Sequence, residues 1–234
     1  MVGMLSDVGN FRKINEDYLG FLSKNECDIY VIADGMGGHN AGEVASKLAV
    51  DTTIEYVKSL NSIDDMDNAL VEGIKLANKK IFEVSKSGER LRGMGTTITA
   101  CLVKDKDMVV ANVGDSSCYI LKEDGLVKVT KDHSLVQQLV DEGSITEEEA
   151  VDHPNKNIIT RALGTNISVE IDTFDVKLND IKKVILCTDG LSNDVSLSEM
   201  YDIILKNDNE DACKQLVELS KLKGARDNIS VIVF

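Results

Sequence analysis

Residues 28–39 read Asp-Ile-Tyr-Val-Ile-Ala-Asp-Gly-Met-Gly-Gly-His. The apolar, β-prone run Ile29–Ala33 predicts a short buried strand, which we expect to stop at Asp34. Three glycines follow: Gly35, Gly37 and Gly38. Because glycine has no side chain, the backbone of such a turn approaches a ligand closely. The stretch therefore predicts a carboxylate at the edge of a sheet.

Asp34 and the backbone carbonyl of Gly35 offer oxygen ligands on adjacent residues. Mg²⁺ and Mn²⁺ are hard cations that prefer carboxylate, carbonyl and water oxygens. The stretch is equally typical of a tight turn with a solvated aspartate. Its function depends on what the rest of the chain brings to the same edge.

The overall composition is that of an ordinary globular protein. The chain has 234 residues, of which 43% are hydrophobic and 28% charged, enough for one large domain. Its formal net charge of −14 argues against a nucleic-acid partner, because phosphate backbones are bound by clustered Lys and Arg. Neither a bilayer-spanning apolar run nor a secretory leader is found, so we expect a cytoplasmic protein with no membrane partner.

The cysteines are scattered, and none forms a Cys-x-x-Cys pair. Three lie in apolar, β-like runs, where a reduced thiol packs as a small hydrophobic side chain: Cys101, Cys118 and Cys187. Phosphatases with a cysteine nucleophile carry an arginine six positions after it, and no cysteine of this chain is followed by arginine there. The pattern excludes that class of phosphatase.

Helical and strand periodicities divide the chain into elements. Amphipathic spacing predicts long helices at these ranges: Ala41–Leu60, Asp64–Ser87, Leu197–Lys206 and Asn209–Lys223. Residues 88–95 are expected to form a loop. Short β-prone runs with tight turns between them predict antiparallel strands: Tyr18–Leu22, Thr96–Val103, Met108–Val113, Ser117–Leu121, Leu126–Val129, Val169–Val176, Lys183–Thr188 and Ile229–Phe234.

The section between His133 and Arg161 is polar and poor in core residues. Two short helices are expected there, at Leu135–Glu142 and Thr146–Val151. We expect residues 133–165 to form a flap beside the site, within a single domain of residues 1–234. Either an ordinary helical excursion or a substrate-contacting role fits this section.

Aspartate stands beside glycine at the ends of three predicted strands, in Asp34-Gly35, Gly114-Asp115 and Asp189-Gly190, and a fourth strand begins just after Asp227. If the fourth strand runs antiparallel to the others, all four carboxylates converge on one edge. Gathered carboxylates repel one another unless cations neutralise them. With Arg12 and Asp17 added, the pattern favours a site for two metal ions over four unrelated turns.

Six motifs occur in order along the chain: Arg12-x-x-Asn15-Glu16-Asp17, Asp34-Gly-Met-Gly-Gly-His39, Gly93-Met-Gly-Thr96-Thr97, Val113-Gly-Asp115-Ser116, Thr188-Asp189-Gly190 and Arg226-Asp227-Asn228. Together they resemble the bacterial type of the metal-dependent Ser/Thr protein phosphatases, type 2C, over essentially the whole chain. The resemblance implies an α+β fold with a central β-sandwich of two antiparallel sheets, flanked by helices on both sides in four layers (αββα). The helical flap would lie beside the metal site.

The same resemblance implies the metal ligands for two tightly bound Mn²⁺ or Mg²⁺ ions. Asp34 would bridge both ions, and the Gly35 carbonyl would bind one of them. Asp189 and Asp227 would bind the other ion, while Asp17 would support the ion on the Gly35 side directly or through water, with Glu16 a weaker candidate. A third, looser ion would be bound by Asp115 together with Asp189.

Arg12 would clamp the substrate phosphate, and Asn228 would orient Asp227 or a bound water. The two ions would activate a water that hydrolyses phosphoserine or phosphothreonine directly, without a phospho-enzyme. The implied partners are phosphorylated proteins, including a cognate Ser/Thr kinase and its substrates, and the enzyme is expected to act as a monomer.

The leaving oxygen also needs a proton. Eukaryotic relatives have histidine directly after Asp-Gly, where this chain has Met36. His39 would donate the proton or merely cap the next helix. His133 and His153 are expected to be structural or surface residues.

Other classes of function share parts of this pattern. A non-enzymatic metal-binding module would have the acidic edge but no use for Arg12. A catalytically dead relative would have lost ligands, and none is missing. A metal-dependent nuclease would use similar ions, but the charge of the chain does not suit DNA.

Overall fold

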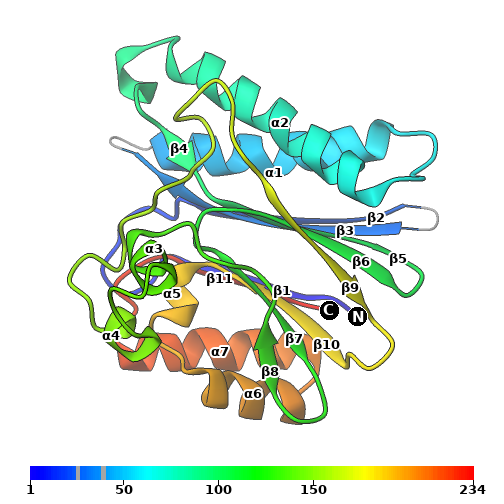
Figure 1. The fold of residues 1–234 in the computed structure, drawn as a ribbon, viewed down its shortest axis with the longest axis vertical. Coiled ribbons are helices and arrows are strands. Elements are labelled where there is room, and N and C mark those ends of the chain that lie inside the picture. The colour runs from blue at the N-terminus through cyan, green and yellow to red at the C-terminus, as the bar shows by residue number, and fades with distance from the viewer. Residues whose placement is uncertain (25–26, 38–40) are drawn as a thin grey trace.

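Two antiparallel sheets lie face to face, and helices cover the outer side of each (Figure 1). This computed structural model describes residues 1–24, 27–37 and 41–234. The expected α+β sandwich of four layers is confirmed, both by these layers and by the known structures compared below.

The first sheet has the strand order β1-β11-β10-β7-β8. Its strands are β1 (Gly3–Asp7), β7 (Ser117–Leu121), β8 (Leu126–Lys128), β10 (Lys183–Cys187) and β11 (Ile229–Val233). The second has the order β2-β3-β5-β6-β9, with a short β4 paired to β3. Its strands are β2 (Asp17–Lys24), β3 (Cys27–Met36), β4 (Gly95–Thr96), β5 (Ile98–Lys104), β6 (Asp107–Val113) and β9 (Asp172–Lys177).

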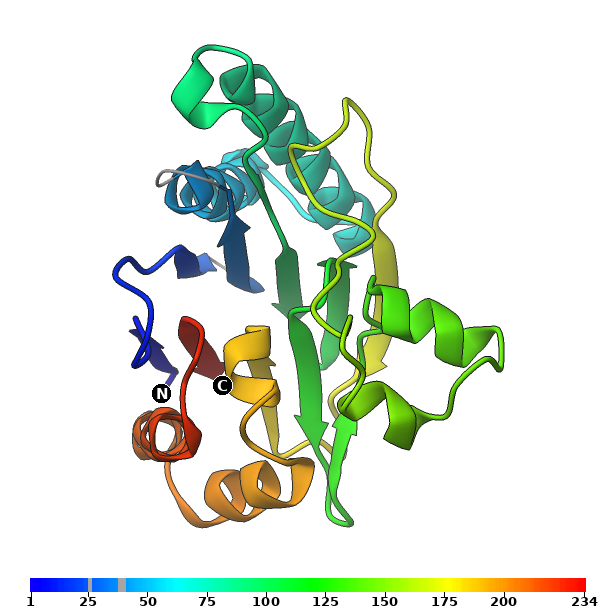
Figure 2. The ribbon, with the colours of Figure 1, turned by 90° about the vertical axis from the view of Figure 1, so that its left-hand side faces the viewer.

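The long helices form the outer layers (Figure 1). α1 (Ala41–Ser59) and α2 (Met66–Ser85) cover the second sheet, while α6 (Leu197–Lys206) and α7 (Asn209–Lys223) cover the first. The short α3 (Leu135–Asp141) and α4 (Glu147–Val151) stand out to one side of the sheets (Figure 2). None of the described helices is long and apolar enough to cross a membrane.

β3 shows why the run Ile29–Ala33 is apolar throughout. Ile29, Val31 and Ala33 belong to the core between the second sheet and its helices. Tyr30 and Ile32 belong instead to the core between the two sheets. A strand buried on both faces reads as a continuous apolar run rather than an alternating one.

The prediction that this strand stops at Asp34 is wrong. Gly35 and Met36 pair with Thr96 and Gly95 of β4, so the strand continues to Met36. Asp34 therefore projects from a strand that is paired with β2 on one side and lies beside β4 on the other, rather than from a free turn.

Other boundaries also differ from the prediction. β9 begins at Asp172 rather than Val169, because its pairing with β6 begins at Asp172; Val169 packs against the helical side of the core. The loop at 88–95 contains a 3₁₀ turn, η1 (Glu89–Leu91), and the strand predicted at Thr96–Val103 is split at Thr97. A short helix that was not predicted, α5 (Asp189–Ser192), follows β10.

Candidate metal and phosphate site

Asp17 and Asp34 come from neighbouring strands of the second sheet. Asp17 opens β2 and is the direct partner of Asp34 on β3. The backbone of Asp34 is held by the opposite segment: its N–H donates to Thr97 Oγ1 (2.9 Å), and its carbonyl accepts from Thr96 Oγ1 (2.8 Å) and Thr97 N (2.9 Å). These bonds fix the point from which the Asp34 carboxylate projects.

Gly35 lies where three segments meet. A Cβ atom at this position would lie 2.2 Å from the Gly42 carbonyl oxygen and 2.5 Å from that of Glu16. The Gly35 N–H donates to the same Glu16 oxygen (3.1 Å), and the Glu16 carboxylate accepts from the N–H of Gly42 at the start of α1 (3.2 Å). Only glycine allows this close approach.

Asp189 and Asp227 come from the first sheet. Asp189 opens α5, which packs so tightly on the start of β11 that a Cβ atom on Gly190 would lie 2.0 Å from the Asn228 carbonyl oxygen. Since β10 and β11 are antiparallel, the end of one meets the start of the other. The sequence predicted this convergence, and the structure has it.

Thr188 links the two sheets at this edge. Its hydroxyl donates to Asp17 Oδ2 (2.9 Å) and accepts from Ser230 N (3.0 Å). All three groups lie within the protein, so this hydroxyl fixes Asp17 against β10 and β11. Sequence reasoning assigned Thr188 no role, because the direction of a hydroxyl at a strand end has no signature in the sequence.

Asp115 lies in the turn between β6 and β7, after Gly114 with its positive φ of 109°. The N–H of Gly114 donates to His133 Nδ1 (3.0 Å). On its other side, His133 Nε2 lies 3.1 Å from Asp172 Oδ2 and 3.0 Å from an Arg161 nitrogen. His133 is thus a buried structural residue that joins the flap to the Asp115 turn.

The five carboxylates act on one another electrostatically. Burial, together with repulsion from Asp189 and Asp227, raises the pKa of Asp17 to about 7. Burial and Asp189 raise the pKa of Asp115 to about 8. The pKa of Asp34 lies well above its ordinary value, because its burial disfavours the charged form and the other four carboxylates repel its charge. Asp34, Asp189 and Asp227 still reach solvent with part of their surface.

The donor set fits divalent cations. Three buried carboxylate oxygens have no hydrogen-bond partner: Oδ1 of Asp17, of Asp115 and of Asp189. Within the described ranges, no three Asp, Glu, His or Cys side chains gather closely enough to enclose one ion by themselves. Waters would therefore have to complete the coordination of an ion bound here, as they commonly do for Mg²⁺.

Arg12 lies at the border of the cluster. Its guanidinium binds Asp227 Oδ2 (2.8 Å), and half of its side-chain surface is exposed. The loop that carries it is tied down by the Asn228 side chain, which donates to the carbonyls of Val8 and Ile14 and accepts from Glu16 N. Asn228 was expected to orient Asp227 or a bound water; its backbone N–H donates to Asp227 Oδ1 at 2.8 Å.

His39 lies outside the described residues, so its expected role stays a prediction. His153 is a flap residue whose Nδ1 accepts from Asn155 N (3.2 Å). The expected buried thiols Cys101, Cys118 and Cys187 are buried and free. A cleft of about 690 Å³ runs from Asp115 and Asp189 between the flap helices and α5, and Lys128 and Lys156 line it.

Comparison with known proteins points to one family. The protein phosphatase 2C family model matches residues 12–219. The chain is 41% identical to the serine/threonine phosphatase stp of Listeria welshimeri, over an alignment that covers 97% of this chain and 92% of the relative.

Solved structures agree. Serine/threonine phosphatase Stp1 from Staphylococcus aureus is similar with a TM-score of 0.95 and 36% identity, covering 99% of this chain and 93% of that one. The catalytic domain of the serine/threonine protein phosphatase PstP, solved in complex with two manganese ions, has a TM-score of 0.86 and 32% identity, covering 100% of this chain and 96% of that one.

Proposed function

This chain belongs to the protein phosphatase 2C family and is a Ser/Thr protein phosphatase, and from that premise we propose how its residues perform the hydrolysis. The observation that supports the proposal is the cluster of five aspartates from both sheets: three of its buried oxygens have no partner, and Arg12 binds Asp227 at its border. Gathering buried carboxylates in one place costs free energy, and bound cations would offset that cost.

In this proposal, Asp34, the Gly35 carbonyl and Asp17 would hold one ion, and Asp34, Asp189 and Asp227 would hold the other, directly or through bound waters. Asp115 and Asp189 hold a third, looser ion. When bound, a Mn²⁺ or Mg²⁺ pair would supply the positive charge that neutralises the carboxylates and that activates a water as the nucleophile. The two-manganese complex of the similar PstP domain supports this assignment of the metal.

Arg12 binds the phosphoryl oxygens of the substrate. One of its nitrogens is bonded to Asp227, which leaves other N–H groups of the planar guanidinium for a phosphate. The bond to Asp227 also holds the side chain in place before the substrate arrives. His39 is a candidate for giving the leaving serine or threonine oxygen its proton.

We further propose that the substrates are phosphorylated proteins of the cytoplasm, that a cognate Ser/Thr kinase opposes the enzyme, and that the chain acts as a monomer. The family resemblance supports the kinase partner. The net charge of −14 supports the exclusion of nucleic acid.

The test is hydrolysis of p-nitrophenyl phosphate and of a phosphothreonine peptide. We expect turnover of both with Mn²⁺, and none once EDTA is in excess. Absence of turnover under both conditions would favour a metal-binding module, and turnover that persists in EDTA would rule out the metal-dependent mechanism.

A further inference from the structure

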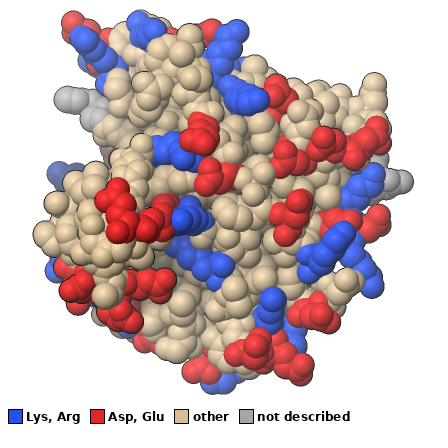
Figure 3. Space-filling model, viewed as in Figure 1, with Lys and Arg blue, Asp and Glu red and all other residues tan. Residues whose placement is uncertain are grey.

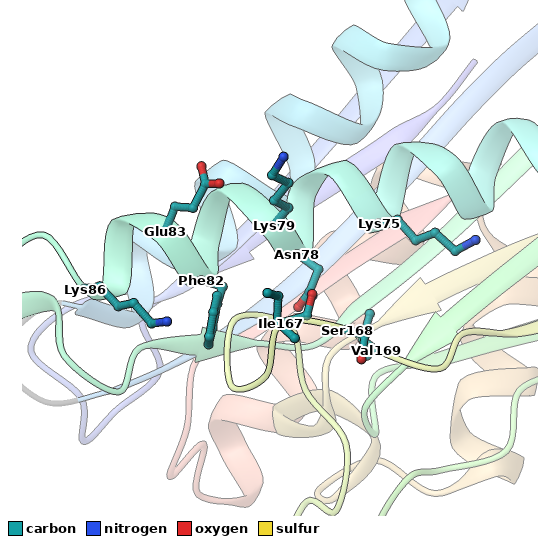
Figure 4. A pocket seen from close by; sticks show the side chains of 9 residues that line it. All are labelled: Lys75, Asn78, Lys79, Phe82, Glu83, Lys86, Ile167, Ser168 and Val169. Atoms are coloured by element: carbon teal, nitrogen blue, oxygen red, sulfur yellow. The ribbon is translucent and has the colours of Figure 1, made fainter.

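A second concavity lies on the helical side of the second sheet, away from the carboxylates (Figure 4). It has a volume of about 550 Å³ and is bounded by one face of α2 and by residues 167–169. Its floor is largely apolar, with Phe82, Ile167 and Val169 among the lining residues. Ile167 leaves 74% of its surface exposed, so it is open to contact by a bound segment.

The groove is preformed, because Asn78 ties its two walls together. This buried side chain on α2 accepts from Gly164 N (2.8 Å) and donates to the carbonyls of Asn166 (3.1 Å) and Ile167 (3.2 Å). A surface that already has its binding conformation loses little free energy to ordering when a partner binds.

The rim of the groove is positive. Lys75, Lys79 and Lys86 line it, against one acidic residue, Glu83. In the part of the chain that the structure describes, Lys79 and Lys86 have no acidic partner, whereas Lys75 binds Glu72 (2.8 Å). Figure 3 shows Lys and Arg atoms along the upper edge of the molecule, over α2, beside a few Asp and Glu atoms.

We propose that this groove docks an acidic segment of a protein partner, with an apolar side chain of that segment seated on Phe82 and Ile167. Lys86 already lies over the Phe82 ring, with Nζ 3.7 Å from its centroid, and so is placed at the boundary between the apolar floor and the charged rim. An extended or helical segment of glutamates with spaced apolar residues matches both features.

The charge of the whole chain favours a short segment over an anionic membrane. Interactions between exposed charges are largely screened beyond about 8 Å at physiological ionic strength, so a short bound segment interacts mainly with the lysines of the rim. A membrane surface faces far more of the protein, whose net charge is −14. Docking of this segment raises the effective concentration, at the reaction centre, of a phosphorylated residue elsewhere on the same partner. In that one respect the inference rests on the proposed function.

The test uses three fluorescein-labelled peptides and fluorescence anisotropy. The first alternates glutamate with leucine and phenylalanine, the second has lysine in place of glutamate, and the third has serine in place of the apolar residues. We expect the first alone to bind. Its Kd should rise about tenfold or more in Lys79→Glu/Lys86→Glu and in Ile167→Asp, since tenfold corresponds to about 1.4 kcal/mol.

The matched control is Lys206→Glu/Lys214→Glu, which makes the same charge change on α6 and α7; its Kd should stay within about twofold of wild type, below about 0.5 kcal/mol. Hydrolysis of p-nitrophenyl phosphate should be unchanged in every variant, which also shows that each is folded.

Several results would overturn the inference. These are equal binding of the serine peptide, an unchanged Kd in the groove variants, or, in a parallel co-sedimentation assay, binding to phosphatidylglycerol vesicles without binding to the first peptide. Loss of wild-type turnover with retained peptide binding would count against the proposed function instead.

Discussion

Asp17 and Asp34 are direct partners across the antiparallel pair of β2 and β3. Side chains of opposed residues point to the same face of a sheet, with Cβ atoms about 4.5–5.5 Å apart, and like charges in such a pair are destabilising. The pair therefore weakens the sheet at the place where the site is built, and a cation between the carboxylates would remove the repulsion.

Asp17→Asn should raise the thermal midpoint of the protein in EDTA by about 2–4 °C, the shift expected for about 1 kcal/mol in a domain of this size. The amide oxygen still accepts from Thr188, so the link between the sheets is kept. The rise in midpoint caused by Mn²⁺ should shrink. Differential scanning calorimetry with and without Mn²⁺ measures both effects.

The control for this change is Asp175→Asn on the exposed face of β9, which removes the same charge. It should leave the effect of Mn²⁺ on the midpoint intact. A full Mn²⁺ response in Asp17→Asn would show that Asp17 takes no part in binding the metal.

Asp189→Ala should abolish Mn²⁺-dependent turnover while the circular dichroism spectrum stays native. Residues that merely support a metal ligand cost about 10–100-fold when lost, so loss of a ligand should cost at least about 100-fold. Rates with p-nitrophenyl phosphate measure this. Retained activity would mean that the metal site is misplaced.

Arg12→Ala should mainly raise the Michaelis constant, by about tenfold or more, because a charge-assisted hydrogen bond contributes about 1.5–3 kcal/mol. Arg12→Lys should recover only part of the loss, since lysine keeps the charge but not the planar fork. The neighbouring exposed cation gives the control, Lys13→Ala, which should behave as wild type. An unchanged Michaelis constant in Arg12→Ala would remove Arg12 from phosphate binding.

Periodicity predicted most helices and strands of this fold, whereas their arrangement in four layers was implied by the family resemblance. The sequence also placed Asp34, Asp189 and Asp227 on one edge, since that inference needed only the antiparallel direction of the last strand. The end of β3 could not be predicted, because it is set by the pairing of Gly35 with Thr96, a residue distant in the chain.

The roles of hydroxyl and amide side chains could not be predicted from the sequence either. Thr188 reads as the last residue of a strand, yet its hydroxyl bonds Asp17 on the other sheet. Asn228 reads as a neighbour of Asp227, yet its side chain binds the loop before Asp17. Both depend on distances between segments, which a linear pattern does not contain.

Asn78→Ala should lower the free energy of unfolding by about 2–4 kcal/mol, because the buried amide makes three bonds to residues 164–167 and its loss leaves buried groups without partners. Gly164 cannot move toward α2 to compensate, since even a Cβ atom there would lie 2.3 Å from Ile81. Urea denaturation gives the value, and Asn166→Ala, on the exposed side of the same loop, should cost less than about 0.5 kcal/mol. If the two variants were equally stable, Asn78 would not be what holds the loop to α2, and the walls of the groove would have to be fixed by packing alone.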